Sequence, residues 1–202
     1  MHAQAKSMRK DGVMKYRDLG KMTGPNDGTR TLLESTLVPE VARTLHDWIA
    51  GTHGKGVLIG GVALSFYVKP RYTQDVDIMF ANDGAIPAEV QGFKRMRPHA
   101  FQHGLTHVEI EMVTPELINV DPVLVAAVMA SAEVHDGIRV ASPSGLVAIK
   151  LGRALGRSIA AQQDRVDIAQ LIDLGRVDVA GFPLGEQELA LYHIMRDPQQ
   201  DD

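Results

Sequence analysis

Two kinds of hydrophobic pattern divide the chain into predicted strands and helices. Short apolar runs, or alternating polar and apolar residues, predict four strands, over 56–61, 75–80, 106–113 and 137–142. Apolar residues three and four positions apart predict helices over 38–51, 62–68, 121–134, 142–161, 163–175 and 185–197. Strands alternate with helices first and a helical block follows. The predicted fold class is therefore α/β (α+β), a mixed β-sheet flanked by helices with a helical C-terminal part.

Residues that favour helix ends support several of these boundaries. Asp121 followed by Pro122 is typical of a helix start, and either Ser142 or Ser144 is expected to cap the helix that begins there. Gly175 is typical of a residue that follows the end of a helix.

Length and composition indicate one globular domain. The 202 residues are 45% hydrophobic and 23% charged, and a chain of this length buries about 70% of its unfolded surface. Cysteine is absent, which excludes disulfides and thiolate chemistry. Because no apolar run is long enough to cross a bilayer and the N-terminus lacks the apolar part of a signal peptide, we expect a cytoplasmic protein without membrane contact.

Charge is distributed unevenly along the chain. Residues 1–30 hold seven Lys/Arg and three Asp/Glu, a net +4, whereas the other 172 hold fourteen and twenty-two, a net −8. Residues 1–30 show little periodicity and are interpreted as a basic, mobile N-terminal arm. We expect residues 31–202 to form one domain, with its sheet core over about 55–141 and its helical part over about 142–202. Its acidic charge disfavours general affinity for nucleic acid.

Two aspartates in the second predicted strand are the first candidates for chemistry. Asp75 and Asp77 are two positions apart, so their side chains lie on one face of the strand, about 6.5–7 Å apart along it. Carboxylates this close repel each other unless a cation lies between them, and oxygen ligands suit Mg²⁺. A third acid from another strand, either Glu109 or Glu111, would complete a site for one or two Mg²⁺ ions. The alternative is a solvated pair, which the surrounding apolar residues disfavour.

The pair Gly60-Gly61 lies at the end of the first predicted strand, where a helix opens. Glycine lets the backbone approach a ligand closely, and the N–H groups at the start of a helix attract phosphate. The alternative is a tight turn without a ligand. Because carboxylates suited to a metal follow one helix later, a phosphate and a metal would meet at the same edge of the sheet.

Three cations recur along the predicted helix 142–161. Lys150, Arg153 and Arg157 are spaced so that they share one face. Cations facing a metal-bound triphosphate would neutralise charge that develops during reaction. The alternative is an exposed face whose cations pair with Asp164 and Asp167.

The segment IGGVALSFYVKPRYTQDVDIMF (59–80) resembles the nucleotidyltransferases of the DNA polymerase beta superfamily, which have a glycine turn, a helix and then D-x-D on the next strand. Its R-x-T-x-D-x-D form is most similar to the AbiEii-like branch, which includes toxins of type IV toxin–antitoxin systems. A second block, SPSGLVAIKLGRALGR followed by QDRVDIAQLI, is similar to that branch's helix with a lysine, followed by an arginine and a D-x-x-D segment. The resemblance spans about residues 55–175 and implies a nucleotidyltransferase-type mixed sheet.

The resemblance implies roles for the residues of the first block. Gly60 and Gly61 would hold the phosphates of a nucleoside triphosphate (NTP), and Asp75 and Asp77 would bind Mg²⁺.

It implies further roles around them. Arg71 and Thr73 would support the strand that carries the metal ligands. Lys150 would contact the triphosphate, and Asp167 would act near it or order the helix pair. Many family members have an aspartate as third acid where this chain has glutamate, and Glu111 is preferred because Ile precedes it and Met-Val follows it.

The resemblance implies a Mg²⁺-dependent enzyme that moves NMP from an NTP to an acceptor hydroxyl and releases pyrophosphate. The acceptor would be RNA, such as a tRNA 3′ end, a protein or a small molecule, and the toxin branch implies an antitoxin-like partner protein. Because the third acid is altered, the alternative is a catalytically weak or inactive nucleotide- or partner-binding protein on the same fold. A sugar-nucleotide glycosyltransferase also carries D-x-D, but that assignment leaves the glycine pair unexplained.

Overall fold

The structure, a computed structural model, describes residues 55–68, 75–90, 92–104, 108–135 and 137–197. Within these ranges seven strands form one mixed sheet, accompanied by six α-helices and a short 3-10 helix, η2 (Asp83–Ala85). The strands are β1 (Val57–Ile59), β2 (Asp75–Met79), β3 (Phe93–Arg97), β4 (Ala100–His103), β5 (Glu109–Val113), β6 (Glu133–His135) and β7 (Ile138–Val140). The helices are α2 (Gly60–Leu64), α3 (Pro115–Ile118), α4 (Pro122–Ala130), α5 (Pro143–Ala154), α6 (Ile159–Ile172) and α7 (Glu186–Arg196). The predicted fold class, α+β with a mixed sheet and a helical C-terminal part, is confirmed.

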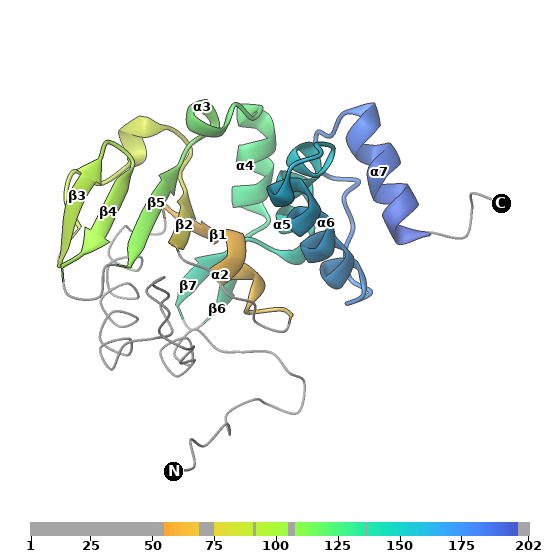
Figure 1. Ribbon diagram of the computed structural model, residues 1–202, viewed down its shortest axis with the longest axis horizontal. Helices are drawn as coiled ribbons and strands as arrows, with labels where there is room; N and C mark the ends of the chain where they lie inside the picture. Colours follow the sequence, from red (N-terminus) through yellow and green to blue (C-terminus); the bar gives the residue numbers. More distant parts are fainter. Residues whose placement is uncertain (1–54, 69–74, 91, 105–107, 136, 198–202) are drawn as a thin grey trace, which may run out of the picture.

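The strand β2 lies in the middle of the sheet, whose order is β3–β4–β5–β2–β1–β7–β6. It pairs antiparallel with β1 and parallel with β5. The hairpin β3–β4 extends the sheet beyond β5, and the hairpin β6–β7 extends it beyond β1. Figure 1 shows α5, α6 and α7 next to one another beside the sheet, and α4 between these helices and the strands β2 and β5.

The strands β2 and β5 have the same burial pattern, which separates apolar residues from acids. Val76 and Ile78 in β2, and Ile110 and Met112 in β5, are buried in the core, while the acids at the alternate positions are partly exposed. Each buried side chain contributes about 1.5–3 kcal/mol relative to an exposed one. Because a shift by one residue would exchange the two faces of a strand, this burial also holds the acids on one face.

The predicted helix over 142–161 is wrong, because two helices occupy this part of the chain. Helix α5 ends at Ala154, and α6 begins after Ser158, whose Oγ accepts a hydrogen bond from the Ala161 N–H at 3.1 Å. Arg157 therefore lies between the helices and does not continue the face of α5 that carries Lys150. Ser158 favours the start of a new helix, and this local preference outweighs the helical periodicity that continues across it.

Other elements also differ from the prediction, among them α2, which covers Gly60–Leu64 where a helix over 62–68 was expected. The helix expected over 121–134 ends at Ala130, and Glu133–His135 forms the edge strand β6, which pairs with β7. The strand β3 was not predicted, because its sequence FKRMR shows little apolar alternation and four of its five residues are exposed. Its place in the sheet comes from pairing with β4.

Helix caps agree with the prediction where the structure describes them. Asp121 accepts a hydrogen bond from the Val123 N–H, and Pro122 is the first residue of α4. Of the two serines, Ser142 caps α5, with the Gly145 N–H donating to its Oγ. The predicted arm 1–30 and the predicted helix 38–51 lie outside the described residues.

Candidate active site

Two rows of residues cross the acid-bearing face of the sheet. Residues paired directly across neighbouring strands point to the same face. From β3 to β2, one row consists of Arg97, Ala100, Glu111 and Asp77, and the other of Lys94, Gln102, Glu109 and Asp75. Four acids thus meet on the two central strands, with basic residues at the β3 end of both rows.

Three of these acids form a group that can hold a metal ion. Carboxylate oxygens of Asp75, Asp77 and Glu111 all lie within 4.8 Å of one another. Glu111 is the glutamate that the family resemblance favoured, and both Glu109 and Glu111 accept hydrogen bonds from Arg97. The parallel pairing of β2 with β5 brings Glu111 opposite Asp77.

Gly60 allows the backbone to lie against the Asp77 carboxylate. An added Cβ at Gly60 would lie 1.9 Å from Asp77 Oδ2, and the backbone there has φ +70°. Any other L-residue would face both a steric clash and a strained backbone. The glycine is required by the turn between β1 and α2 and by its contact with the candidate metal ligand.

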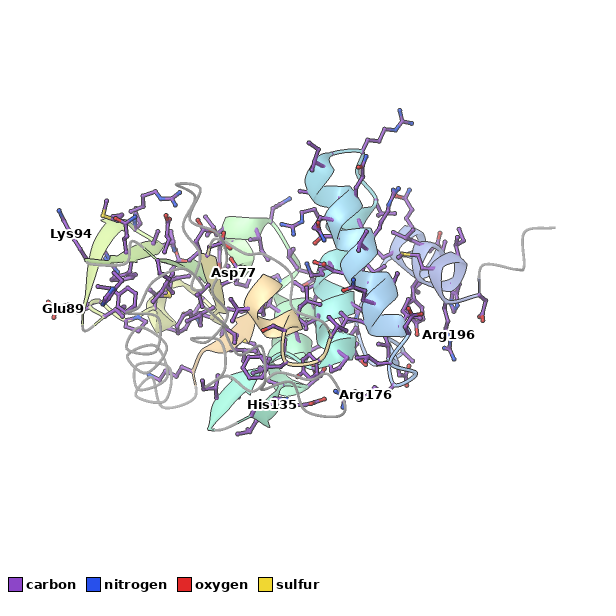
Figure 2. All side chains as sticks on the ribbon, turned by 60° about the horizontal axis from the view of Figure 1, so that its bottom comes forward. Asp77, Glu89, Lys94, His135, Arg176 and Arg196 are labelled. Atoms are coloured by element: carbon purple, nitrogen blue, oxygen red, sulfur yellow. The ribbon has the colours of Figure 1, made fainter. Side chains whose placement is uncertain are left out.

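The pKa of Asp77 is raised to about 7. Burial is the largest cause, and the negative charges of Asp75 and Glu111 add to it. Lys150 and Arg153 act in the opposite direction. Figure 2 shows Asp77 near the middle of the molecule, beside α2. The protein has therefore concentrated negative charge at a place where water stabilises it poorly.

A pocket of about 620 Å³ lies beside this group. Its wall includes Gly60, Asp77 and Glu111 from the sheet side and Lys150 and Arg153 from α5. Further parts of the wall come from the loop between α3 and α4, from α4 and from α7. Carboxylates and cations thus share one cavity, which is large enough for a small organic ligand.

Lys150 is buried in an ion-pair network between α5 and α6. Its Nζ donates to Asp164 Oδ1 at 2.6 Å and to Asp167 Oδ2 at 2.9 Å. Arg153 also donates to Asp164, through Nε and through a second nitrogen at 2.9 Å. Burial raises the pKa of Asp164, but the hydrogen bonds and charges of Arg153 and Lys150 outweigh it and leave the pKa below its usual value.

This network bears on both interpretations of the cations. Lys150 and Arg153 do pair with Asp164, and Lys150 with Asp167, as the alternative expected. Lys150 is not solvated, however, since it is 5% exposed and both aspartates are almost fully buried, whereas 64% of the Arg153 side chain is exposed. An ammonium has three donors, so the two bonds to Asp164 and Asp167 leave one for a ligand in the pocket.

The structure brings several predicted site residues together and separates others. Gly60, Asp77, Glu111 and Lys150 line one pocket, and Asp75 joins them through the metal group.

Two other predicted residues lie apart from the pocket wall, and two more lie outside the described residues. Gly61 is buried in α2, and Asp167 of α6 pairs with Lys150 of α5. Arg71 and Thr73 lie outside the described residues. Their predicted roles stay predictions.

Two residues of this region were not assigned from the sequence. Arg97 contacts both glutamates, and Glu188 of α7 lines the pocket. Neither belongs to a motif, because Arg97 depends on the register of three strands and Glu188 on the packing of α7 against α5. Gly152 in α5 was a weak sequence signal for the close packing of α7, since a Cβ at this position would lie 2.8 Å from Glu188 Oε1.

Comparison with known proteins does not identify a family. No protein-family model matches the chain, and no curated protein matches it. Within the part of the chain that the structure describes, none of the helices has the length and apolar character needed to cross a membrane.

The site has the donor set of a small divalent cation bound through oxygen. Asp75, Asp77 and Glu111 offer carboxylate oxygens, the ligand type of Mg²⁺, Mn²⁺ and Ca²⁺. A bound cation would also offset the repulsion that contributes to the raised pKa of Asp77. The residues therefore fit a metal ion.

Replacing Gly60 by alanine should destabilise the protein. The left-handed backbone alone costs about 1–2 kcal/mol for a residue with a Cβ, and the Asp77 carboxylate must move as well. The control is Gly104→Ala, since an added Cβ there has no atom within 4 Å. Urea unfolding measures both variants. Equal stability of the two would contradict the requirement for glycine at position 60.

Replacing Asp77 by asparagine should stabilise the metal-free protein, and more so at high pH. The folded state holds the Asp77 proton up to about pH 7, whereas the unfolded state releases it near pH 3.9. Ionising Asp77 therefore lowers the stability of the wild type as the pH rises through this range. In EDTA, the gain in free energy of unfolding should be larger at pH 8 than at pH 5 by on the order of 2 kcal/mol. A pH-independent loss of stability would contradict this account.

Proposed function

We propose that the protein is a Mg²⁺-dependent nucleotidyltransferase that moves NMP from an NTP to an acceptor hydroxyl and releases pyrophosphate. The observation that carries this proposal is the pocket in which the carboxylates of Asp77 and Glu111 face the cations Lys150 and Arg153. A metal-bound triphosphate needs both kinds of group, oxygen ligands for the metal and cations for its phosphates. The volume of the pocket suits a ligand of this size.

In this proposal the acidic residues bind the metal ion and the basic residues bind the phosphates. Asp75, Asp77 and Glu111 hold Mg²⁺, which would neutralise phosphate oxygens and orient the triphosphate. Lys150 contacts the triphosphate with the donor that its two aspartates leave, and Arg153 approaches from the same helix face. Gly60 lets the phosphates approach the backbone, because it lines the pocket without a side chain.

The reaction itself is a displacement at the α-phosphorus. The acceptor oxygen forms a bond to this phosphorus, the bond to the bridging oxygen of the β-phosphate breaks, and pyrophosphate leaves. The hydroxyl proton passes to a carboxylate of the pocket, Asp77 or Glu111. The main contribution of the protein is then positioning and charge stabilisation.

The resemblance of the two sequence blocks supports the AbiEii-like branch of the DNA polymerase beta superfamily as the family. The topology is compatible with it, since the strand that Gly60-Gly61 follow lies antiparallel to the strand with both aspartates, and the third acid follows on a parallel neighbour. On this proposal the acceptor is RNA, a protein or a small molecule, and the protein acts as a toxin with an antitoxin-like partner.

A labelling experiment tests the proposal. The protein is incubated with each α-labelled NTP, Mg²⁺ and total bacterial RNA, and label is followed in RNA and in protein. We expect label from one NTP. The labelling rate should fall by at least about 100-fold in Asp77→Asn, because the variant lacks a carboxylate ligand of the Mg²⁺ ion whose charge would stabilise the transition state. Asp173→Asn is the matched control, since Asp173 is exposed at the end of α6.

The outcomes separate the proposal from its alternative. Label that is equal in the wild type and Asp77→Asn would exclude the metal role of Asp77. Mg²⁺-dependent NTP binding without label or pyrophosphate would favour the nucleotide-binding protein. Absence of both NTP binding and pyrophosphate release would contradict the nucleotide site.

A further inference from the structure

The acid-bearing face presents two glutamates in nearly equivalent positions. Glu109 lies opposite Asp75 and Glu111 lies opposite Asp77 on the same pair of strands. The two are partly exposed to similar degrees, with 30% and 39% of their side chains accessible. Strand geometry alone therefore does not explain why Glu111, and not Glu109, joins the two aspartates in the candidate metal group.

Arg97 contacts both glutamates. Its guanidinium donates to Glu109 Oε1 and, at 3.1 Å, to Glu111 Oε1. Arg97 lies on β3, two strands away from β5, and the residue between it and Glu111 in the cross-strand row is Ala100. Because alanine is small, the long arginine side chain can reach over β4 to both carboxylates.

We propose that Arg97 is a positioning residue that assigns the two glutamates to different roles. It holds Glu109 away from the metal and orients Glu111, whose second oxygen, Oε2, remains for the ion. This inference rests on the metal site of the proposed function and adds a residue to it that lies outside both sequence motifs. A planar guanidinium with five donors suits a bridge between two carboxylates, whereas an ammonium is a single point of charge.

The chemistry of the contact sets the size of the expected effect. Arg97 has 62% of its side chain exposed, and exposed ion pairs contribute little to stability. Removing Arg97 should therefore leave the fold intact. It should also free Glu109 to bind the metal ion. Because an exposed ion pair with arginine is weak, freeing Glu109 should change the affinity for the metal ion by about fivefold.

The test is Mn²⁺ binding in the absence of nucleotide, measured by electron paramagnetic resonance of free Mn²⁺. Glu111→Gln should weaken binding by about 10-fold or more, because a ligand is lost. Adding Arg97→Ala to Glu111→Gln should tighten binding again by about fivefold, because Glu109 is then free to replace Glu111. A residue with a merely structural role would weaken binding further when removed and would not restore it.

Two controls separate this role from a general effect of charge. Lys94→Ala in the Glu111→Gln background removes the same charge from the same strand and should change the affinity by less than about twofold, because solvent and salt screen an exposed charge. In the Glu109→Gln, Glu111→Gln background, Arg97→Ala should not tighten binding, because no carboxylate of Glu109 is left to be released. A general charge effect would tighten binding there as well, and that result would overturn the proposal.

The remaining outcomes distinguish this inference from the proposed function. Wild-type protein that binds no Mn²⁺, or Glu111→Gln that binds as the wild type does, would overturn the metal group together with the role of Arg97. Normal binding by the wild type, weakened by Glu111→Gln but not recovered with Arg97→Ala, would overturn the role of Arg97 alone.

Discussion

The mutual repulsion of carboxylates on the central strands is the constraint on which the arrangement of the site depends. Asp75 and Asp77 lie on β2, which has hydrogen-bonded neighbours on both sides, so their backbone has little freedom to separate them. The apolar residues on the opposite face of β2 are buried and hold its register. The negative charge must then be balanced by cations or by protons, because burial, together with the charges of Asp75 and Glu111, raises the pKa of Asp77 against the opposing effect of Lys150 and Arg153.

Protein cations surround this charge from two directions. Arg97 approaches from the β3 edge and contacts the glutamates, while Lys150 and Arg153 approach from α5 across the pocket. The pocket beside α5 borders Asp77 and Glu111. A metal ion and an anionic ligand, bound together, would complete the charge balance in a way that neither achieves alone.

The buried network of Lys150 serves orientation more than stability. Removing an ammonium and two carboxylates from water is costly, and such networks often contribute little net free energy to folding. Here the network joins α5 to α6, the two helices with the most extensive contact in the described structure. Asp164 and Asp167 hold the ammonium at one place in the pocket wall, so a ligand would meet a cation whose position is already set.

Local patterns in the sequence predicted the fold class and the acid-bearing strands, because alternation and burial act within one segment. They left Glu109 and Glu111 as alternatives, and the preference for Glu111 came from the family resemblance. They did not predict β3, whose polar residues pair through β4, or the role of Arg97, which depends on the register of three strands. The break between α5 and α6 was missed because helical periodicity was weighted above the Ser158 cap. Lys150 was found by its spacing, but its two buried partners follow from helix packing.

The most direct test of the central claim is a crystal structure with Mn²⁺ and a non-hydrolysable NTP analogue, with the metal located by its anomalous scattering. The account predicts an ion bound by Asp75, Asp77 and Glu111, about 2.0–2.2 Å from their oxygens, and phosphates between that ion and Lys150. Glu109 should stay with Arg97. An ion located elsewhere, or nucleotide bound outside the pocket, would contradict the claim that these carboxylates form a metal-dependent nucleotide site.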